Sequence, residues 1–165
     1  MNKDLIDMCR YTREIKPNLT IRIHTNGGIQ NESWWTELAN VLQGPHTVVF
    51  AIDGLEDTNH LYRIGVNYQR LMKNVKAFIS NNGNADWAFI EFKHNEHQID
   101  EAKKIAEQLG FTEFLLIASS RFDNSKTIIL NKKNQEIEKN TLISNNTMNE
   151  IININERRIF NQSSR

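Results

Sequence analysis

The residues from Val48 to Ile52 form an unbroken apolar run, VVFAI, and this run constrains the fold more than any other stretch. It is too short for a helix of ordinary length, whereas five consecutive apolar residues are typical of a strand covered on both faces. Such strands occur mainly in parallel sheets, where a helix connects each strand to the next. The run therefore predicts a parallel sheet with helices packed against it.

The pattern of a short strand followed by a helix repeats along the first 118 residues. The predicted strands are 19–23, 47–52, 87–92 and 114–118. The predicted helices are 3–16, one that Asn31 or Ser33 caps and Gly44-Pro45 ends, about 66–80, and about 97–109 with Gly110 as a left-handed cap. Alternation of this kind favours an α/β fold with right-handed crossovers.

Each predicted strand ends in a polar cluster. The clusters are HTNGG, DGLEDTNHLYR, KHNEH and SSRF. Because parallel strands end at the same edge of a sheet, these clusters are expected to form one rim, where ligands of such folds bind. Asp53 and Arg63 in the second cluster would suit a small zwitterionic or phosphorylated ligand. The alternative is that Asp53 caps a turn and Arg63 pairs with a surface acid.

Composition excludes several classes of protein. The net charge is +0 and the pI is about 7.0, so no basic field attracts nucleic acid or an anionic membrane. No apolar run approaches the roughly 20 residues that span a bilayer, and the N-terminus does not resemble a signal peptide. The one cysteine, Cys9, lies on an apolar helix face with Leu5, Ile6 and Ile15 and is expected to be buried. We therefore expect a cytoplasmic protein.

Familiar catalytic and metal-binding motifs are absent from the sequence. The run from His94 to His97, HNEH, lacks the spacing of a zinc motif, and Asn95 or Glu96 is expected to cap the following helix instead. Ser119 and Ser120 have no recognisable base. The sequence therefore predicts no metal ligand and identifies no catalytic residue.

The character of the chain changes after Phe122. Two segments, Thr127 to Leu130 and Glu136 to Leu142, flank KKNQ and predict a small hairpin, and an Asn-rich tail follows. We therefore expect an α/β unit over 1–122 and a hairpin with a tail over 123–165.

Four segments together resemble the second half of a radical S-adenosylmethionine enzyme, in the subgroup related to sulfatase-maturating and peptide-modifying enzymes. They are IRIHTNGG, VVFAIDGLEDTNHLYR, AFIEFKHNEHQIDEAKKIAEQLGF and SSRF, within residues 1–125. The resemblance implies an incomplete (β/α) barrel, in which this chain supplies strands three to six of the family's six-stranded partial barrel.

The resemblance also implies two cofactors, S-adenosylmethionine and a 4Fe-4S cluster. The family's CxxxCxxC loop and its Gly-Gly-Glu-type motif do not occur here, so the cluster ligands are not in this chain. The resemblance implies that the cluster segment lies on a longer parent or a separate chain, or that the gene product is truncated. We expect the chain alone to be inactive.

Residue by residue, the resemblance assigns Arg63 to the carboxylate of the methionine. Asn26, Asp53 and Asn95 would lie on the cofactor side of the rim, and Lys93 and Arg121 become candidates for contact with a small-molecule or peptide substrate. Ala51 stands where the family often has a serine that contacts the same carboxylate.

Two other functions remain open from the sequence. A degenerate, non-catalytic half-barrel would bind a partner or a small ligand, with pairing through the exposed edge strand 19–23. A phosphate-handling α/β enzyme would use Thr25 to Gly28 at a strand end together with the helix near Asn31.

Overall fold

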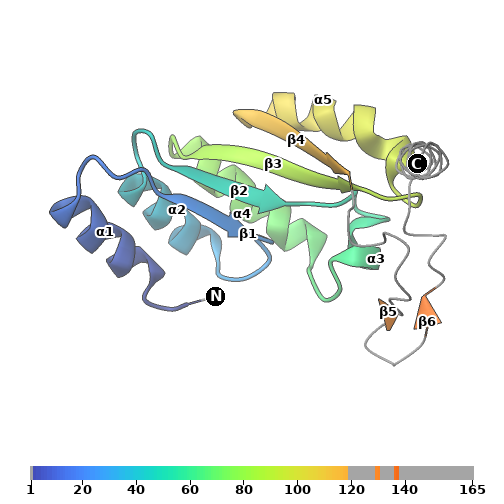
Figure 1. The fold of residues 1–165 in the computed structure, drawn as a ribbon, viewed down its shortest axis with the longest axis horizontal. Coiled ribbons are helices and arrows are strands. Elements are labelled where there is room, and N and C mark those ends of the chain that lie inside the picture. The colour runs from blue at the N-terminus through green and yellow to red at the C-terminus, as the bar shows by residue number, and fades with distance from the viewer. Residues whose placement is uncertain (1, 119–128, 131–135, 138–165) are drawn as a thin grey trace, which may run out of the picture.

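The computed structural model describes residues 2–118, 129–130 and 136–137. A four-stranded sheet runs through it in the order β1-β2-β3-β4 (Figure 1). The strands are β1 (Arg22–Thr25), β2 (Thr47–Ala51), β3 (Asn84–Glu91) and β4 (Glu113–Ala118). All three neighbouring pairs are parallel, which confirms the predicted parallel α/β arrangement.

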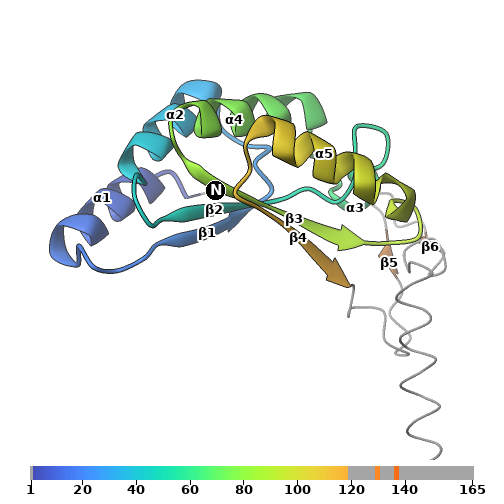
Figure 2. The same ribbon diagram turned by 90° about the horizontal axis from the view of Figure 1, so that it is seen from above.

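The long helices lie together on one face of this sheet, as Figure 2 shows. They are α1 (Leu5–Ile15), α2 (Glu32–Val41), α4 (Tyr68–Ser80) and α5 (Ile99–Leu109). Two short elements, α3 (Asn59–Tyr62) and the 3₁₀ helix η1 (Glu96–Gln98), stand between a strand end and the next long helix. No helix in the described part of the chain is long and apolar enough to cross a membrane.

Large aromatic and aliphatic side chains fill the layer between the helices and the sheet. Trp35, Phe50, Phe78, Trp87 and Phe89 are all fully buried there. The two indole N–H groups also find acceptors: Trp35 Nε1 donates to Ile29 O at 3.1 Å, and Trp87 Nε1 donates to Ile52 O at 2.8 Å. The second bond joins the core directly to the end of β2.

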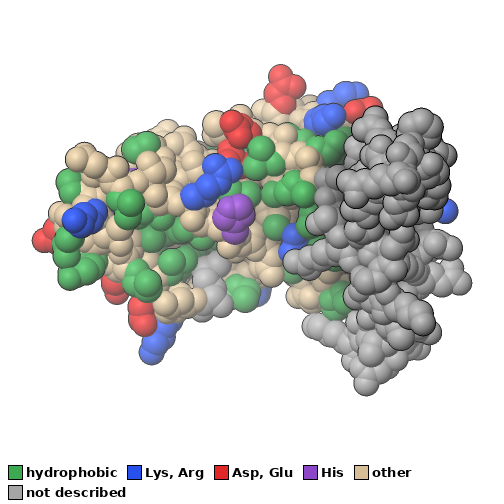
Figure 3. All heavy atoms as spheres, viewed as in Figure 1, with side chains coloured by type: hydrophobic (Ala, Val, Ile, Leu, Met, Phe, Trp, Pro, Cys, Tyr) green, Lys and Arg blue, Asp and Glu red, His purple; other side chains and the backbone are tan. Residues whose placement is uncertain are grey.

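Figure 3 shows the face of the sheet that these helices leave uncovered, with hydrophobic side chains beside charged ones and a histidine. Arg22 alternates with Ile23, which packs against the core, so Arg22 belongs to the uncovered face. Its Nη2 forms an ion pair with Asp86 Oδ2 of β3 at 2.8 Å. This face therefore carries its own cross-strand polar contact.

Local sequence signals placed two of the helix ends correctly. Asn31 caps α2 by accepting a bond from Trp34 N at 3.0 Å, as predicted. Gly110 ends α5 in the left-handed conformation with φ 84°, also as predicted.

The structure corrects three predictions about the ends of elements. The first strand is Arg22–Thr25 rather than 19–23, because pairing with β2 begins at Arg22 opposite Thr47, and Leu19 is 53% exposed. Ile15 is exposed rather than on the inner face of α1. The third strand begins at Asn84, where Asn84 pairs with Thr47, three residues before the predicted start.

A separate antiparallel pair, β5 (Ile129–Leu130) with β6 (Glu136–Ile137), lies within the two segments predicted to form a hairpin. The predicted domain boundary at 122, the SSRF cluster with Arg121, and the predicted tail lie outside the described residues.

Candidate functional site

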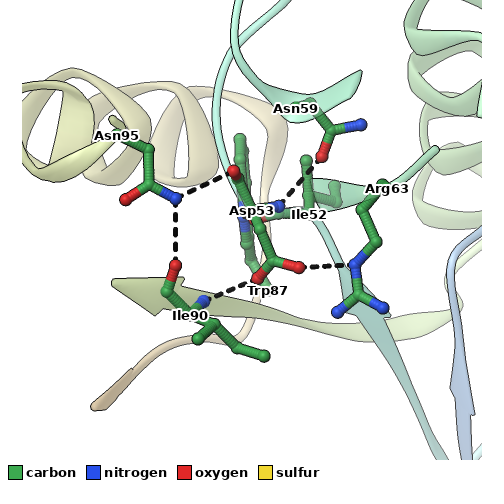
Figure 4. A network of polar contacts seen from close by, with 7 residues as sticks. All are labelled: Ile52, Asp53, Asn59, Arg63, Trp87, Ile90 and Asn95. Carbon is green, nitrogen blue, oxygen red and sulfur yellow. Dashed lines mark hydrogen bonds and ion pairs between the residues drawn. The ribbon is translucent and has the colours of Figure 1, made fainter. Parts of the chain in front are cut away.

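The parallel pairing brings the ends of β1, β2 and β3 to one edge of the sheet. Asn26, Asp53 and Asn95 follow these three strands in turn. Among them the structure joins Asp53 and Asn95 directly, and Arg63 reaches the same point from the end of α3 (Figure 4). The rim that the sequence predicted therefore has its densest polar contacts at the end of β2 and β3.

Asp53 is fully buried and bonded on all sides. Its backbone N donates to Asn59 Oδ1 at 2.9 Å, and its carboxylate Oδ1 accepts a bond from Ile90 N at 2.6 Å. Its Oδ2 forms an ion pair with Arg63 Nε. The alternative in which Asp53 caps a turn and Arg63 pairs with a surface acid is wrong, because Asp53 binds groups of other elements and is itself the buried partner of Arg63.

Arg63 presents part of its guanidinium to the rim. Its side chain is 24% exposed, and Cζ lies 5.2 Å from the centroid of the Tyr62 ring. Nε is used by Asp53, whereas the two Nη groups have no hydrogen-bond partner among the described residues. A guanidinium held at Nε with both Nη groups available is arranged to bind an anionic oxygen pair.

Asn95 is also fully buried, and its amide serves only the backbone. Nδ2 donates to Asp53 O at 2.9 Å and to Ile90 O at 3.0 Å, while Oδ1 accepts from Phe92 N at 2.7 Å. Asn95 therefore does not cap η1 through its side chain, contrary to expectation. It fastens the end of β3 to the end of β2 instead.

The remaining predicted residues lie apart from this network. Asn26 is half-buried, and its Oδ1 accepts a bond from Gly28 N at 3.2 Å within its own turn. Lys93 is exposed, and Arg121 lies outside the described residues.

Two buried amides near Asp53 were not identified from the sequence. Asn59 is fully buried, and its Nδ2 has no hydrogen-bond partner within the described part of the chain. Gln98 bonds to the loop before α3. Both residues lie in stretches whose sequence predicts polar loops. They are buried because α3 and η1 pack against the rest of the molecule. No local signal in the sequence marks either residue.

Burial also changes the ionisation of a neighbouring phenol. Burial, followed by the negative charges of Glu56, Asp57 and Glu101, raises the pKa of Tyr68 to about 12. Tyr68 therefore stays protonated and uncharged at neutral pH, at the start of the helix that follows the Asp53–Arg63 loop.

The described residues suit S-adenosylmethionine better than a 4Fe-4S cluster. Arg63, whose side chain is 24% exposed, can donate from its Nη groups to an acceptor such as a carboxylate. Among the described residues the buried Nδ2 of Asn59 is a second donor without a partner. An iron–sulfur cluster does not fit the described residues, among which no group of three or more His, Cys, Asp or Glu could hold a metal. Cys9 is buried, and burial raises the pKa of its thiol, which keeps it protonated.

No family model and no curated protein matches the chain. Solved structures do match it. SuiB of Streptococcus suis bound to S-adenosylmethionine gives a TM-score of 0.60 at 19% identity over 76% of this chain and 28% of that one. SuiB bound to the precursor peptide SuiA gives 0.61 at 20% identity over 73% and 27%. Native anSMEcpe with bound AdoMet gives 0.53 at 14% identity over 70% and 32%.

These structural neighbours are radical S-adenosylmethionine enzymes. The chain spans less than a third of the length of each of these three structures. At this identity the likeness concerns the fold: a four-stranded parallel α/β sheet similar to part of those enzymes.

Proposed function

We propose that this chain is the S-adenosylmethionine-binding part of a radical S-adenosylmethionine enzyme and forms strands three to six of an incomplete (β/α) barrel. The observation that carries the proposal is the Asp53–Arg63 pair at the carboxyl end of β2, in a fold similar to that of SuiB and anSMEcpe. Ligands of such sheets bind at this edge.

In this proposal Arg63 binds the carboxylate of the methionine through its Nη groups. Asp53 holds the guanidinium at Nε and so fixes the direction of the Nη groups. A charge-assisted bond of this kind contributes about 1.5–3 kcal/mol. Asn26 lines the same side of the rim from the end of β1, and Ala51 offers no hydroxyl to the ligand.

Asn95 acts indirectly, because its amide is buried and bonded to backbone. Lys93 and Arg121 remain candidates for substrate contact. A peptide is the substrate class that the complex of SuiB with SuiA favours. We also propose a cytoplasmic location, since one cysteine suits a reducing compartment.

The 4Fe-4S cluster of the proposed enzyme would be held by polypeptide outside these 165 residues. The residues of this chain bind and orient S-adenosylmethionine and exclude water from it. The isolated chain should therefore produce no 5′-deoxyadenosine after anaerobic reconstitution with iron and sulfide. Production of 5′-deoxyadenosine by the chain alone would contradict the proposal that the cluster is held by other polypeptide.

Isothermal titration calorimetry with S-adenosylmethionine tests the role of Arg63. Arg63→Gln should weaken binding about 10- to 150-fold, the equivalent of the lost charge-assisted bond. Arg70→Gln is the matched control, since Arg70 is exposed and its side chain has no bonded partner among the described residues. 5′-Methylthioadenosine, which has no carboxylate, should bind wild type and Arg63→Gln alike.

Arg63→Gln leaves the buried Asp53 without its ion-pair partner, so its folding has to be checked by thermal denaturation. Arg63→Lys is the second variant, because it keeps the charge and loses the two-pronged geometry. Equal affinity of wild type and both Arg63 variants for S-adenosylmethionine would contradict the proposal.

A second candidate function, a non-catalytic partner-binding module, is favoured by the amino-terminal side of the sheet. In the described part of the chain β1 pairs only with β2, so its outer edge is unpaired. Met8, Tyr11 and Ile15 of α1 and Leu19 beyond it are exposed apolar residues. Light scattering tests this candidate, and a monomer at all concentrations with no ligand bound would contradict it.

A further inference from the structure

Gln98 of η1 is a buried residue that bonds to the loop following β2. It is 5% exposed. Its Oε1 accepts bonds from Leu55 N at 3.0 Å and from Thr58 Oγ1, and its Nε2 donates to Asp57 Oδ1 at 2.7 Å. One side chain therefore satisfies three groups of a loop that lies 40 to 43 residues away in sequence.

Hydrogen bonds continue from this loop to Arg63. Leu55, whose N is held by Gln98, accepts at its O a bond from Asn59 N at 2.8 Å. Asn59 in turn accepts at its O a bond from Arg63 N at 2.8 Å. Three consecutive bonds thus connect the Gln98 side chain with the backbone of Arg63, through the first turn of α3.

The loop between these bonds has little freedom to take another shape. Gly54 has φ 139°, a conformation that L side chains rarely adopt. A Cβ on Gly54 would lie 2.2 Å from Thr58 Oγ1 and 3.0 Å from Asn59 N. The turn packs directly against Thr58, which precedes α3, and Asn59, its first residue. A shift of Leu55 or Thr58 would therefore also move α3.

We propose that Gln98 is a positioning residue that fixes the first turn of α3 and thereby directs the Arg63 guanidinium toward Asp53. The proposal rests on the proposed function, because Arg63 is the group that would bind the methionine carboxylate. Among the described residues the side chain of Gln98 bonds to Leu55, Asp57 and Thr58 and not to Arg63, so it acts through the backbone of Leu55 and Asn59. Without its acceptor the Leu55 N–H loses its partner, and the first turn of α3 loosens.

Three variants separate positioning from general stability. Gln98→Met has similar length and removes all three bonds. Gln98→Glu keeps an acceptor for Leu55 and Thr58, loses the donor to Asp57 and places two carboxylates together. Gln69→Met is the matched control, because Gln69 is exposed and bonds to Glu56 of the same loop through Nε2 at 2.7 Å.

The readout is hydrogen exchange of the Arg63 Nε–H, followed by NMR together with backbone amides. In Gln98→Met the Nε–H and the amides of Asn59 and Arg63 should exchange at least about tenfold faster, while amides of α2 keep their rates. Gln98→Glu should give an intermediate acceleration at the same sites, and Gln69→Met should give none.

Unchanged Arg63 Nε–H exchange in Gln98→Met would overturn the proposal, and so would equal acceleration in α2. Should Gln98→Met fail to fold, Gln98→Glu carries the test, and unchanged exchange there overturns it. Affinity for S-adenosylmethionine is measured separately and should fall about tenfold in Gln98→Met. If wild type binds no S-adenosylmethionine, the proposed function fails, whereas the exchange result still decides the role of Gln98.

Discussion

Two regions of the molecule differ in the kind of side chain that they bury. One is the carboxyl ends of β2 and β3, and the other is the edge of the described sheet, formed by β1 with α1 beside it. At the strand ends, Asp53 and Asn95 are 0% exposed and each is bonded to neighbouring elements. At the edge, Met8 is 54% and Tyr11 64% exposed. Buried, satisfied polar groups specify a single geometry, whereas exposed apolar groups suit contact with another surface. The strand ends therefore resemble a preformed site, and the edge resembles a docking surface.

The largest effect in this comparison is expected for Asn95→Ala. It removes the amide partner of the buried groups Phe92 N and Asp53 O and of the part-buried Ile90 O, so the free energy of unfolding should fall by about 3 kcal/mol. Urea denaturation measures it, with exposed Asn18→Ala as the control. A loss no greater than that of Asn18→Ala would show that the strand ends are not held by this amide.

A buried polar residue, His46, also occurs beside this edge. The pH dependence of the free energy of unfolding tests its contribution. Burial, and then the positive charge of Arg13, lowers the pKa of His46 below its ordinary value of 6.5, and its Nδ1 accepts a bond from Ile21 N at 3.1 Å. The unfolded chain thus binds this proton more readily than the folded one. Stability from neutral His46 is present above pH 6.5 and is lost as pH falls through the folded pKa.

The matched variant is His46→Gln, which cannot take up a proton. Between pH 7 and pH 5 the free energy of unfolding should fall more for wild type than for His46→Gln, by less than the effect of Asn95→Ala. Parallel pH profiles for the two proteins would mean that His46 does not support the amino end of β1 in its neutral form.

Features set by neighbouring residues were predictable, and those set by distant ones were not. The run Val48–Ile52 predicted β2, and Asn31 and Gly110 marked helix ends, because each signal acts within a few residues. The sequence singled out Asp53 and Arg63 but not their pairing, since that depends on where α3 places Arg63.

Asn95 and Gln98 show the same limit more clearly. Asn95 was expected to cap a helix, yet its partners Asp53 and Ile90 belong to the ends of two strands. The four residues of α3, Asn59–Tyr62, carry no helical periodicity that a sequence could reveal. Gln98 accepts bonds from the loop that precedes α3, so its role could not be predicted without knowing where α3 lies.

The smallest effect on stability is expected at the edge. Tyr11→Ser combined with Ile15→Ser should change the free energy of unfolding by less than about 0.5 kcal/mol per site, because both side chains already contact water. The same variant should reduce self-association in light scattering, whereas Leu61→Ser, an exposed apolar site on α3, should not. Equal association of wild type and the double variant would remove the evidence for a docking surface there.

We propose that the ends of β1, β2 and β3 share one site in which Arg63 binds the carboxylate of S-adenosylmethionine. Titration of the isotope-labelled chain with S-adenosylmethionine, followed by NMR, is the decisive experiment. Chemical-shift changes are expected mainly at Asn26, 53–63 and 90–95, including the Arg63 Nε–H. Changes confined to α1 and the amino ends of the strands, or no changes at saturating ligand, would contradict it.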